Sequence, residues 1–189
     1  MGGQLKLARS MASKPEFAQL LDFYIDRLDR SGIELQLGRD FNLDALMEFR
    51  PDQIICATGS VPRPLYLDGK LQQEVHQAVE ILENQTALAG QVVVIGGAIT
   101  GLDAADFLSK QGAHVTIIEA GKQAGSGLEW YLRKMRLKAL RDAGVKILVQ
   151  FQVAQVQRGF VVCKDQEGTE NRIPADKTVV AIGFISYNP

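Results

Sequence analysis

A glycine-rich segment in the middle of the chain has the residue types that can hold a phosphate group. Residues 95 to 108 read IGGAITGLDAADFL, and this segment continues the apolar run Val92-Val93-Val94-Ile95. A parallel strand that turns tightly into a helix leaves the first N–H groups of the helix unpaired, with the positive end of the helix dipole at the turn. Such a turn is an anion site. We therefore expect the amides that open the helix near Ile99 to face a diphosphate.

Two of the three glycines of the dinucleotide fingerprint G-x-G-x-x-G are present in this segment. Gly96 permits the tight turn, and Gly101 lets the helix lie close to the strand. Ala98 stands where the second glycine would let the backbone touch pyrophosphate, and its methyl group should weaken that contact without abolishing the site. The predicted cofactor-binding residues of the loop are Gly96, Gly97, Ala98, Ile99, Thr100 and Gly101.

An acidic residue follows at the distance where a ribose ligand is expected. Glu119 ends the next predicted strand, 18 residues after Gly101, and an acid at this place binds the ribose hydroxyls of a dinucleotide. Its carboxylate would repel a 2′-phosphate, so the charge favours NAD(H) over NADP(H). Two alternatives stay open: the turn is only a close-packed strand-to-helix junction, or Glu119 is a solvated carboxylate at a strand end.

The elements that would position these residues alternate between strand and helix. This alternation is typical of a parallel sheet built from right-handed crossovers. Three short strands then suggest an antiparallel meander, and an apolar strand over 177–183 ends at Gly183. We predict an α/β fold: a Rossmann-like parallel sheet with helices on both faces and an antiparallel β-meander, plus a partial second α/β lobe. The predicted ranges are strand 91–95, helix 99–111, strand 113–119, helix 127–142, strand 145–149, and meander strands 152–157, 159–164 and 170–173.

The first part of the chain is predicted to form the second, smaller lobe. Its pattern indicates a capped amphipathic helix over about 15–30, a strand over Ile33–Leu37, a short helix over Leu43–Phe49 and a buried strand from Asp52 to Gly59. A linker over 60–69 and a connecting helix over 74–84 lead into the sheet.

Composition excludes several classes of function. The 189 residues include 21 basic and 22 acidic side chains, so the totals give no sign of binding to nucleic acid or to an anionic membrane. Cys56 and Cys163 form neither a redox pair nor a zinc motif, and we predict no metal site. Neither histidine has a partner that would make a catalytic pair. We expect a chain of the reducing cytoplasm with no membrane helix.

Four segments carry a resemblance to a known family. Residues 52 to 64, DQIICATGSVPRP, resemble the D-x-x-x-x-A-T-G-x-x-P-R-x-P signature that joins the FAD and NAD(P)H domains of glutathione-reductase-like, two-dinucleotide-binding flavoproteins. GGQLKLA at 2–8, the glycine segment at 92–108 and ADKTVVAIGF at 175–184 follow the same order and spacing. The chain is similar to the C-terminal region of NADH:flavin oxidoreductases of the 2,4-dienoyl-CoA reductase and trimethylamine dehydrogenase type.

The resemblance implies a piece of a larger flavoenzyme. Such enzymes carry a TIM barrel with FMN and an iron–sulfur cluster, followed by an FAD domain into which an NAD(P)H domain is inserted. By this resemblance, residues 1–64 are a remnant of the FAD domain, residues 65–85 a linker and connecting helix, and residues 86–189 the NAD(P)H-binding domain. Gly183 ends a strand near the cofactor cleft. Gly2, Gly3 and Gln4 would lie beside FAD, and Ala57, Thr58 and Gly59 would mark the crossover between domains.

The expected function is therefore that of an NAD(H)-binding fragment. In the intact enzyme, hydride would pass from nicotinamide to flavin, and the fragment alone would lack FAD and turnover. The alternative is a vestigial nucleotide-binding scaffold or interaction module without nicotinamide chemistry. Strands 33–37 and 52–58 would have open edges, which predicts either a collapsed N-terminal lobe or a homodimer.

Overall fold

The chain forms two compact units in its computed structural model, which describes residues 1–9, 16–39, 42–67 and 75–187. The larger unit is Pro62–Phe184, and the smaller unit combines Met1–Val61 with Ile185–Pro189. The larger unit contains the glycine-rich segment.

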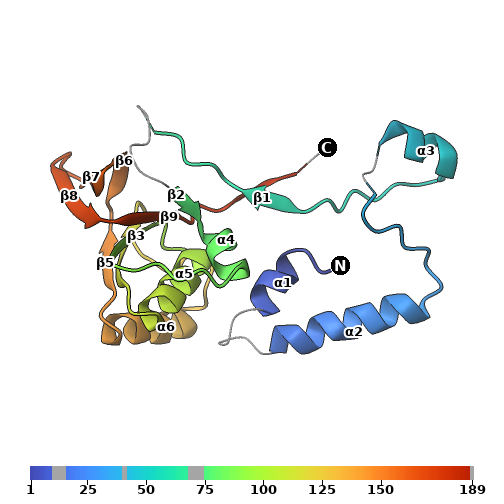
Figure 1. The fold of residues 1–189 in the computed structure, drawn as a ribbon, viewed down its shortest axis with the longest axis horizontal. Coiled ribbons are helices and arrows are strands. Elements are labelled where there is room, and N and C mark those ends of the chain that lie inside the picture. Colours follow the sequence, from blue (N-terminus) through green and yellow to red (C-terminus); the bar gives the residue numbers. More distant parts are fainter. Residues whose placement is uncertain (10–15, 40–41, 68–74, 188–189) are drawn as a thin grey trace. The chain divides into compact units, whose positions relative to one another are not determined.

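A five-stranded parallel sheet is the centre of the larger unit, with strand order β2-β9-β3-β4-β5 (Figure 1). Val92, Val93 and Val94 of the middle strand are 0% exposed, as expected for a parallel strand that is covered on both faces. β3 and β4 pair in register from Gln91↔His114 to Ile95↔Ile118. The strand bounds are β2 Val75–Gln77, β3 Gln91–Ile95, β4 His114–Glu119, β5 Lys146–Val149 and β9 Lys177–Val180.

Three helices of the larger unit pack together on one face of this sheet. They are α4 (Ala78–Glu83), α5 (Ile99–Lys110) and α6 (Trp130–Asp142). α5 contacts β3 and β4 as well as both other helices. It buries Leu102, Ala105 and Leu108, whose spacing of three residues keeps them on one side of a helix.

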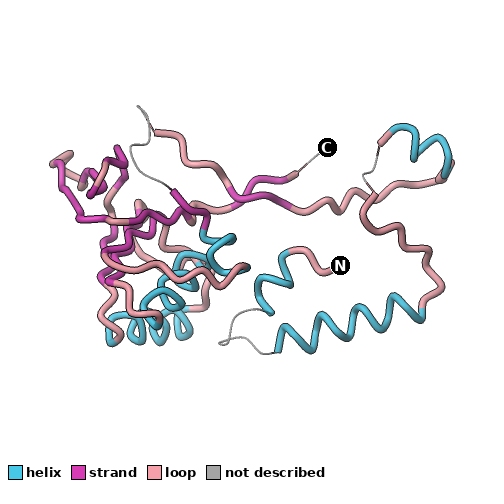
Figure 2. The backbone as a smooth tube through the Cα atoms, viewed as in Figure 1, coloured by secondary structure: helices cyan, strands magenta, loops and turns pink. Residues whose placement is uncertain are grey.

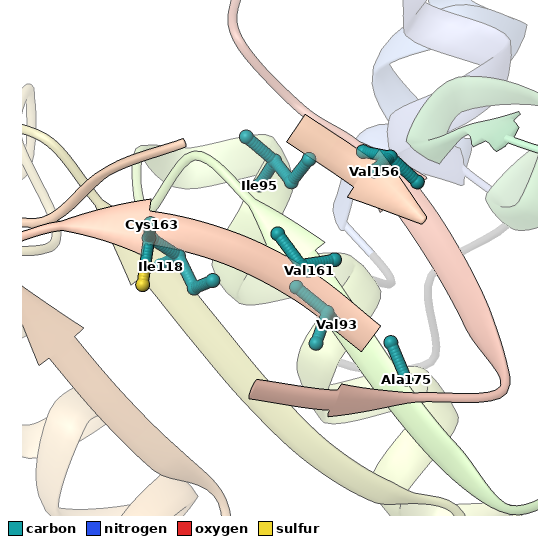
Figure 3. Packing of buried hydrophobic residues seen from close by; sticks show 7 residues of the cluster. All are labelled: Val93, Ile95, Ile118, Val156, Val161, Cys163 and Ala175. Atoms are coloured by element: carbon teal, nitrogen blue, oxygen red, sulfur yellow. The ribbon is translucent and has the colours of Figure 1, made fainter. Parts of the chain in front are cut away.

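A three-stranded antiparallel sheet covers the opposite face. It consists of β6 (Gln152–Gln157), β7 (Gly159–Lys164) and β8 (Glu170–Ala175) in the order β6-β7-β8. The predicted parallel sheet and meander are therefore confirmed, but the meander takes the place of helices on the second face. Figure 3 shows how its side chains pack on those of the parallel sheet, in a cluster of Val93, Ile95, Ile118, Val156, Val161, Cys163 and Ala175.

The described residues of the smaller unit form three helices: α1 (Gln4–Arg9), α2 (Glu16–Arg30) and α3 (Leu43–Phe49). α1 packs on α2, and Leu21 is the buried residue of α2. The side chain of Asn42 caps α3 by accepting from Ala45 N at 2.9 Å. α1 was not predicted, whereas α3 matches the predicted range.

A two-stranded sheet of β1 (Ser60–Pro62) and β10 (Phe184–Ser186) lies where the chain passes between the units. Arg63 N donates to Gly183 O at 2.9 Å, and Tyr187 N donates to Gly59 O at 3.0 Å. The residue numbers of these two pairs run in opposite directions, so the strands are antiparallel. Neither strand was predicted.

Two predicted strands of the first 84 residues are wrong, and a predicted helix is shorter than expected. The segments Ile33–Leu37 and Asp52–Thr58 are drawn as loop in Figure 2, because neither has a hydrogen-bonded strand beside it. The helix predicted over 74–84 starts only at Ala78, since Val75–Gln77 pairs with β9 instead. Positions 15, 68–69 and 74 of the predicted segments lie outside the described residues. Among those described, no helix combines the length and the apolar character needed to cross a bilayer.

The two cysteines have opposite environments, and this difference predicts their reactivity. Cys56 is exposed, whereas Cys163 is buried and donates its thiol hydrogen to Asn171 O at 3.7 Å. Burial, and then the nearby Asp165 carboxylate, raise the pKa of the Cys163 thiol, so little reactive thiolate forms at neutral pH. We expect Ellman's reagent to label Cys56 at once and Cys163 only on unfolding. Rapid labelling of a folded Cys56→Ser variant would contradict the buried position.

Candidate dinucleotide-binding site

A pocket of about 340 Å³ lies at the carboxyl ends of three adjacent strands, β9, β3 and β4. β3 is the strand where the order changes direction: β4 and β5 lie on one side of it, and β9 and β2 on the other. Ligands of open α/β sheets bind at this switch point, outside the carboxyl ends of the strands. The pocket is lined by Ile95, Gly96, Ala98, Ile118, Glu119, Ala120, Ser126, Phe151, Val153, Ala181, Ile182 and Gly183.

The glycine turn between β3 and α5 depends on two close backbone approaches. Gly96 has φ +101°, and a Cβ at this position would lie 2.4 Å from Ala181 O. A Cβ on Gly101 would lie 2.0 Å from Gly96 O. Neighbouring backbone atoms therefore leave no room for a side chain at either position. This agrees with the roles that the sequence assigns to Gly96 and Gly101.

Ala98, which directly precedes α5, lines the pocket, whereas Gly97, Ile99, Thr100 and Gly101 are not among its lining residues. The first backbone bond that closes the helix runs from Leu102 N to Ala98 O at 3.0 Å, and no side chain caps the helix at Ala98. Within the described residues, the N–H groups of Ala98, Ile99 and Thr100 have no acceptor. These are the unpaired donors that an anion site needs.

Glu119 lies against the glycine turn and accepts a hydrogen bond from one of its amides. Its Oε2 accepts from Gly97 N at 2.6 Å, and its Oε1 accepts from Gly121 N at 2.6 Å. Gly97 O in turn accepts from Gly125 N at 2.6 Å. The structure thus brings Glu119 and the turn together, as predicted, but the N–H of Gly97 bonds to the carboxylate and is not offered to a phosphate.

The remaining predicted residues fall into two groups. Gly183 lines the pocket and has φ +93°. Gly2, Gly3, Gln4, Ala57, Thr58 and Gly59 belong to the smaller unit and are not among the residues that line this pocket.

Two of these residues make hydrogen bonds within or next to the smaller unit. Gln4 Nε2 donates to Ser60 Oγ at 2.6 Å, and the hydroxyl of Thr58 donates to Tyr187 O. A separate hollow of about 380 Å³ in this unit, lined in part by Arg39, Phe49 and Ile54, contains none of them.

Nine residues of the site were not among the predicted cofactor-binding residues: Ile95, Ile118, Ala120, Gly121, Ser126, Phe151, Val153, Ala181 and Ile182. Ser126, Phe151 and Val153 line the pocket, and Gly121 binds the carboxylate of Glu119. A glycine two residues after the acid is a weak local signal. Phe151 and Val153 are placed by the meander, whose position over the sheet no local pattern specifies.

The parallel sheet, the glycine turn and the acid at the end of the next strand define a Rossmann-type domain of the class that binds dinucleotides. The chain belongs to the pyridine nucleotide-disulphide oxidoreductase family, whose model matches residues 9–188.

Several characterised proteins are similar to the chain. It is 29% identical over 187 residues to an NADH oxidase of Thermoanaerobacter brockii, with 97% of this chain and 29% of that protein covered. It is 28% identical over 190 residues to a cinnamate reductase of Clostridium sporogenes, with 98% and 28% covered. The solved structure of a 2-naphthoyl-CoA reductase with 2-naphthoyl-CoA matches with 26% identity and a TM-score of 0.86, covering 97% of this chain and 28% of that one.

These similarities confirm the predicted resemblance to NADH:flavin oxidoreductases. They also show that the chain spans less than a third of the length of these three proteins. Family membership implies binding of flavin or pyridine nucleotide.

Proposed function

We propose that the chain binds NAD(H) as the nucleotide-binding part of a larger flavin-dependent oxidoreductase. One observation carries this proposal: a pocket at the switch point of the sheet is lined both by Ala98, whose N–H has no acceptor among the described residues, and by Glu119. Amides suit a diphosphate, and a carboxylate suits ribose hydroxyls.

Each group at the turn has a distinct proposed role. The N–H groups of Ala98, Ile99 and Thr100 bind the pyrophosphate, with Gly96 and Gly101 keeping the backbone close enough. The methyl group of Ala98 limits how near a phosphate can come. Gly97 acts through Glu119, because its N–H holds that carboxylate. The carboxylate accepts from the ribose hydroxyls and disfavours a 2′-phosphate.

Nicotinamide, when bound, supplies the hydride that flavin accepts. The residues of this chain bind the nucleotide and orient it. We extend the proposal to the remaining predicted residues: Gly2, Gly3 and Gln4 lie beside FAD in the intact enzyme, and Ala57, Thr58 and Gly59 mark the crossover between domains. Gly183 ends a strand near the cofactor cleft. The proposed domains are 1–64, 65–85 and 86–189. The proposed partner is the rest of the enzyme, a barrel with FMN and an iron–sulfur cluster, or a second copy of the chain. A reducing cytoplasm is the proposed compartment.

A titration of the purified chain with NADH, NADPH and ADP tests the proposal. We expect saturable NADH binding, followed by nucleotide fluorescence, and weaker binding of NADPH. Ala98→Gly should tighten NADH and ADP alike by about fivefold, because a phosphate oxygen gains a closer approach to the backbone. The backbone of Ala98 has φ −76°, so the change relieves no strain and its effect reports the methyl group alone.

The bond from Gly97 N to Glu119 favours a second candidate, a scaffold whose nucleotide site is vestigial. In that case the carboxylate fills the anion position permanently. If neither the original chain nor the Ala98→Gly variant binds any of the three nucleotides, the result would support the scaffold and contradict the proposed function.

A further inference from the structure

The glycine turn after β3 and the segment after β4 together hold the carboxylate of Glu119 at two points. One oxygen is held by Gly97 N and the other by Gly121 N, each at 2.6 Å. A carboxylate held through one oxygen can still rotate about its last side-chain bond, because such terminal torsions are broad. Two amides on opposite oxygens fix both its position and its plane, and each oxygen keeps a further lone pair for a ligand.

Gly121 differs from Gly96 and Gly101 in the atoms that an added Cβ would meet. At Gly96 and Gly101 an added Cβ would collide with backbone oxygens. At Gly121 the nearest atom would be Glu119 Oε1 at 2.9 Å, and the next two would lie at 3.8 and 3.9 Å. The backbone of Gly121 is not among the positive-φ glycines, so alanine can adopt it. The missing side chain at position 121 therefore leaves room for the Glu119 carboxylate, and the backbone conformation does not require glycine there.

We propose that Gly121 is a positioning residue, which with Gly97 holds the Glu119 carboxylate on the pocket wall and so sets the choice between nucleotides with and without a 2′-phosphate. This inference rests on the proposed function. The fixed carboxylate accepts hydrogen bonds from the two ribose hydroxyls of NADH. It repels a 2′-phosphate, because both groups are negatively charged. A carboxylate free to turn away would lose much of both effects.

Gly121→Ala tests this role without altering the carboxylate itself. The new methyl group meets only the movable end of Glu119, so we expect the side chain to swing aside and the melting temperature to stay unchanged. NADH binding should weaken about tenfold, as on loss of one hydrogen bond to a charged group. NADPH binding should not weaken. The dissociation constant of NADPH divided by that of NADH should therefore fall by at least about tenfold.

Gln123→Ala is the matched control, because Gln123 is exposed in the same loop and makes no contact with the carboxylate in the described structure. It should change neither dissociation constant. An unchanged ratio in a folded Gly121→Ala variant, or an equal loss for both nucleotides, would overturn the positioning role.

A measurement without nucleotide separates this inference from the proposed function. In amide NMR spectra, the Gly97 and Gly121 protons should exchange slowly with solvent, because each is hydrogen-bonded to the Glu119 carboxylate. Glu119→Ala should speed the exchange of both protons, and Gly121→Ala should speed that of Gly97. Rapid exchange of either proton in the original chain would overturn the two-point contact. Slow exchange of both in a chain that binds neither nucleotide would leave the contact established and refute both the proposed function and the choice between nucleotides.

Discussion

Gly101→Ala is expected to destabilise the larger unit by about 3 kcal/mol or more and to abolish nucleotide binding. In an ordinary helix this change would stabilise by roughly 1 kcal/mol, since alanine has the higher helix propensity. Here the added Cβ would lie 2.0 Å from Gly96 O and 3.0 Å from Gly96 C. Both atoms are backbone at the turn itself, so α5 must move away from β3 and carry its first amides with it.

Gly112→Ala is the control for this prediction. Gly112 follows the end of the same helix with φ +89°, and a Cβ there would meet nothing within 4 Å. The free energy of unfolding of this control should fall by only about 1–2 kcal/mol, because alanine is strained in the left-handed region. Its affinity for NADH should not change. Urea unfolding and an NADH titration of both variants make the comparison. A Gly101→Ala variant as stable as the original chain would refute the close approach.

The part of the fold that sequence predicts well is the part specified by local signals. β3, α5 and β4 begin and end within about a residue of expectation, because an unbroken apolar run, a glycine turn and a helix-terminating glycine follow one another. The strands of the meander at 152–157 and 159–164 match for the same reason: each is bounded by residues that favour turns.

Predictions that required a distant partner were less successful. Ile33–Leu37 and Asp52–Thr58 have apolar residues typical of strands, but a strand exists only when a neighbour pairs with it, and here Ile55 is 90% exposed. β2 was missed because its partner, β9, lies about a hundred residues further on.

The candidate site shows the same division between local and distant information. The spacing of Gly96, Gly101 and Glu119 placed an acid beside the turn. The bond that this acid makes to Gly97 depends on a side-chain conformation that spacing does not specify.

A buried ion pair between α5 and α6 supports the second large prediction. Arg136 Nη2 lies 2.5 Å from Asp103 Oδ1, and the side chains are 24% and 3% exposed respectively. Removing one partner of a buried pair leaves the other charge without compensation, which costs about 3–5 kcal/mol. The cost depends on which charge remains, because a partly exposed group can still be hydrated.

Arg136→Ala is therefore expected to lower the free energy of unfolding by about 3 kcal/mol, since the buried carboxylate loses the guanidinium of Arg136. Asp103→Ala should cost less, because the remaining guanidinium reaches water. Replacing both residues with apolar ones, as in Asp103→Leu with Arg136→Met, should recover much of the loss. Urea unfolding of the single and double variants measures these three changes in the free energy of unfolding.

The pair Asp106–Lys110 on the same helix is the control, with a separation of 2.7 Å but side chains 27% and 65% exposed. Lys110→Ala should cost less than about 0.5 kcal/mol, as expected for a hydrated i,i+4 pair. Because α5 carries the amides of the glycine turn, loosening it from α6 should also weaken NADH binding in Arg136→Ala but not in Lys110→Ala. Equal stabilities for these two variants would show that the Asp103–Arg136 contact contributes no more than a surface ion pair.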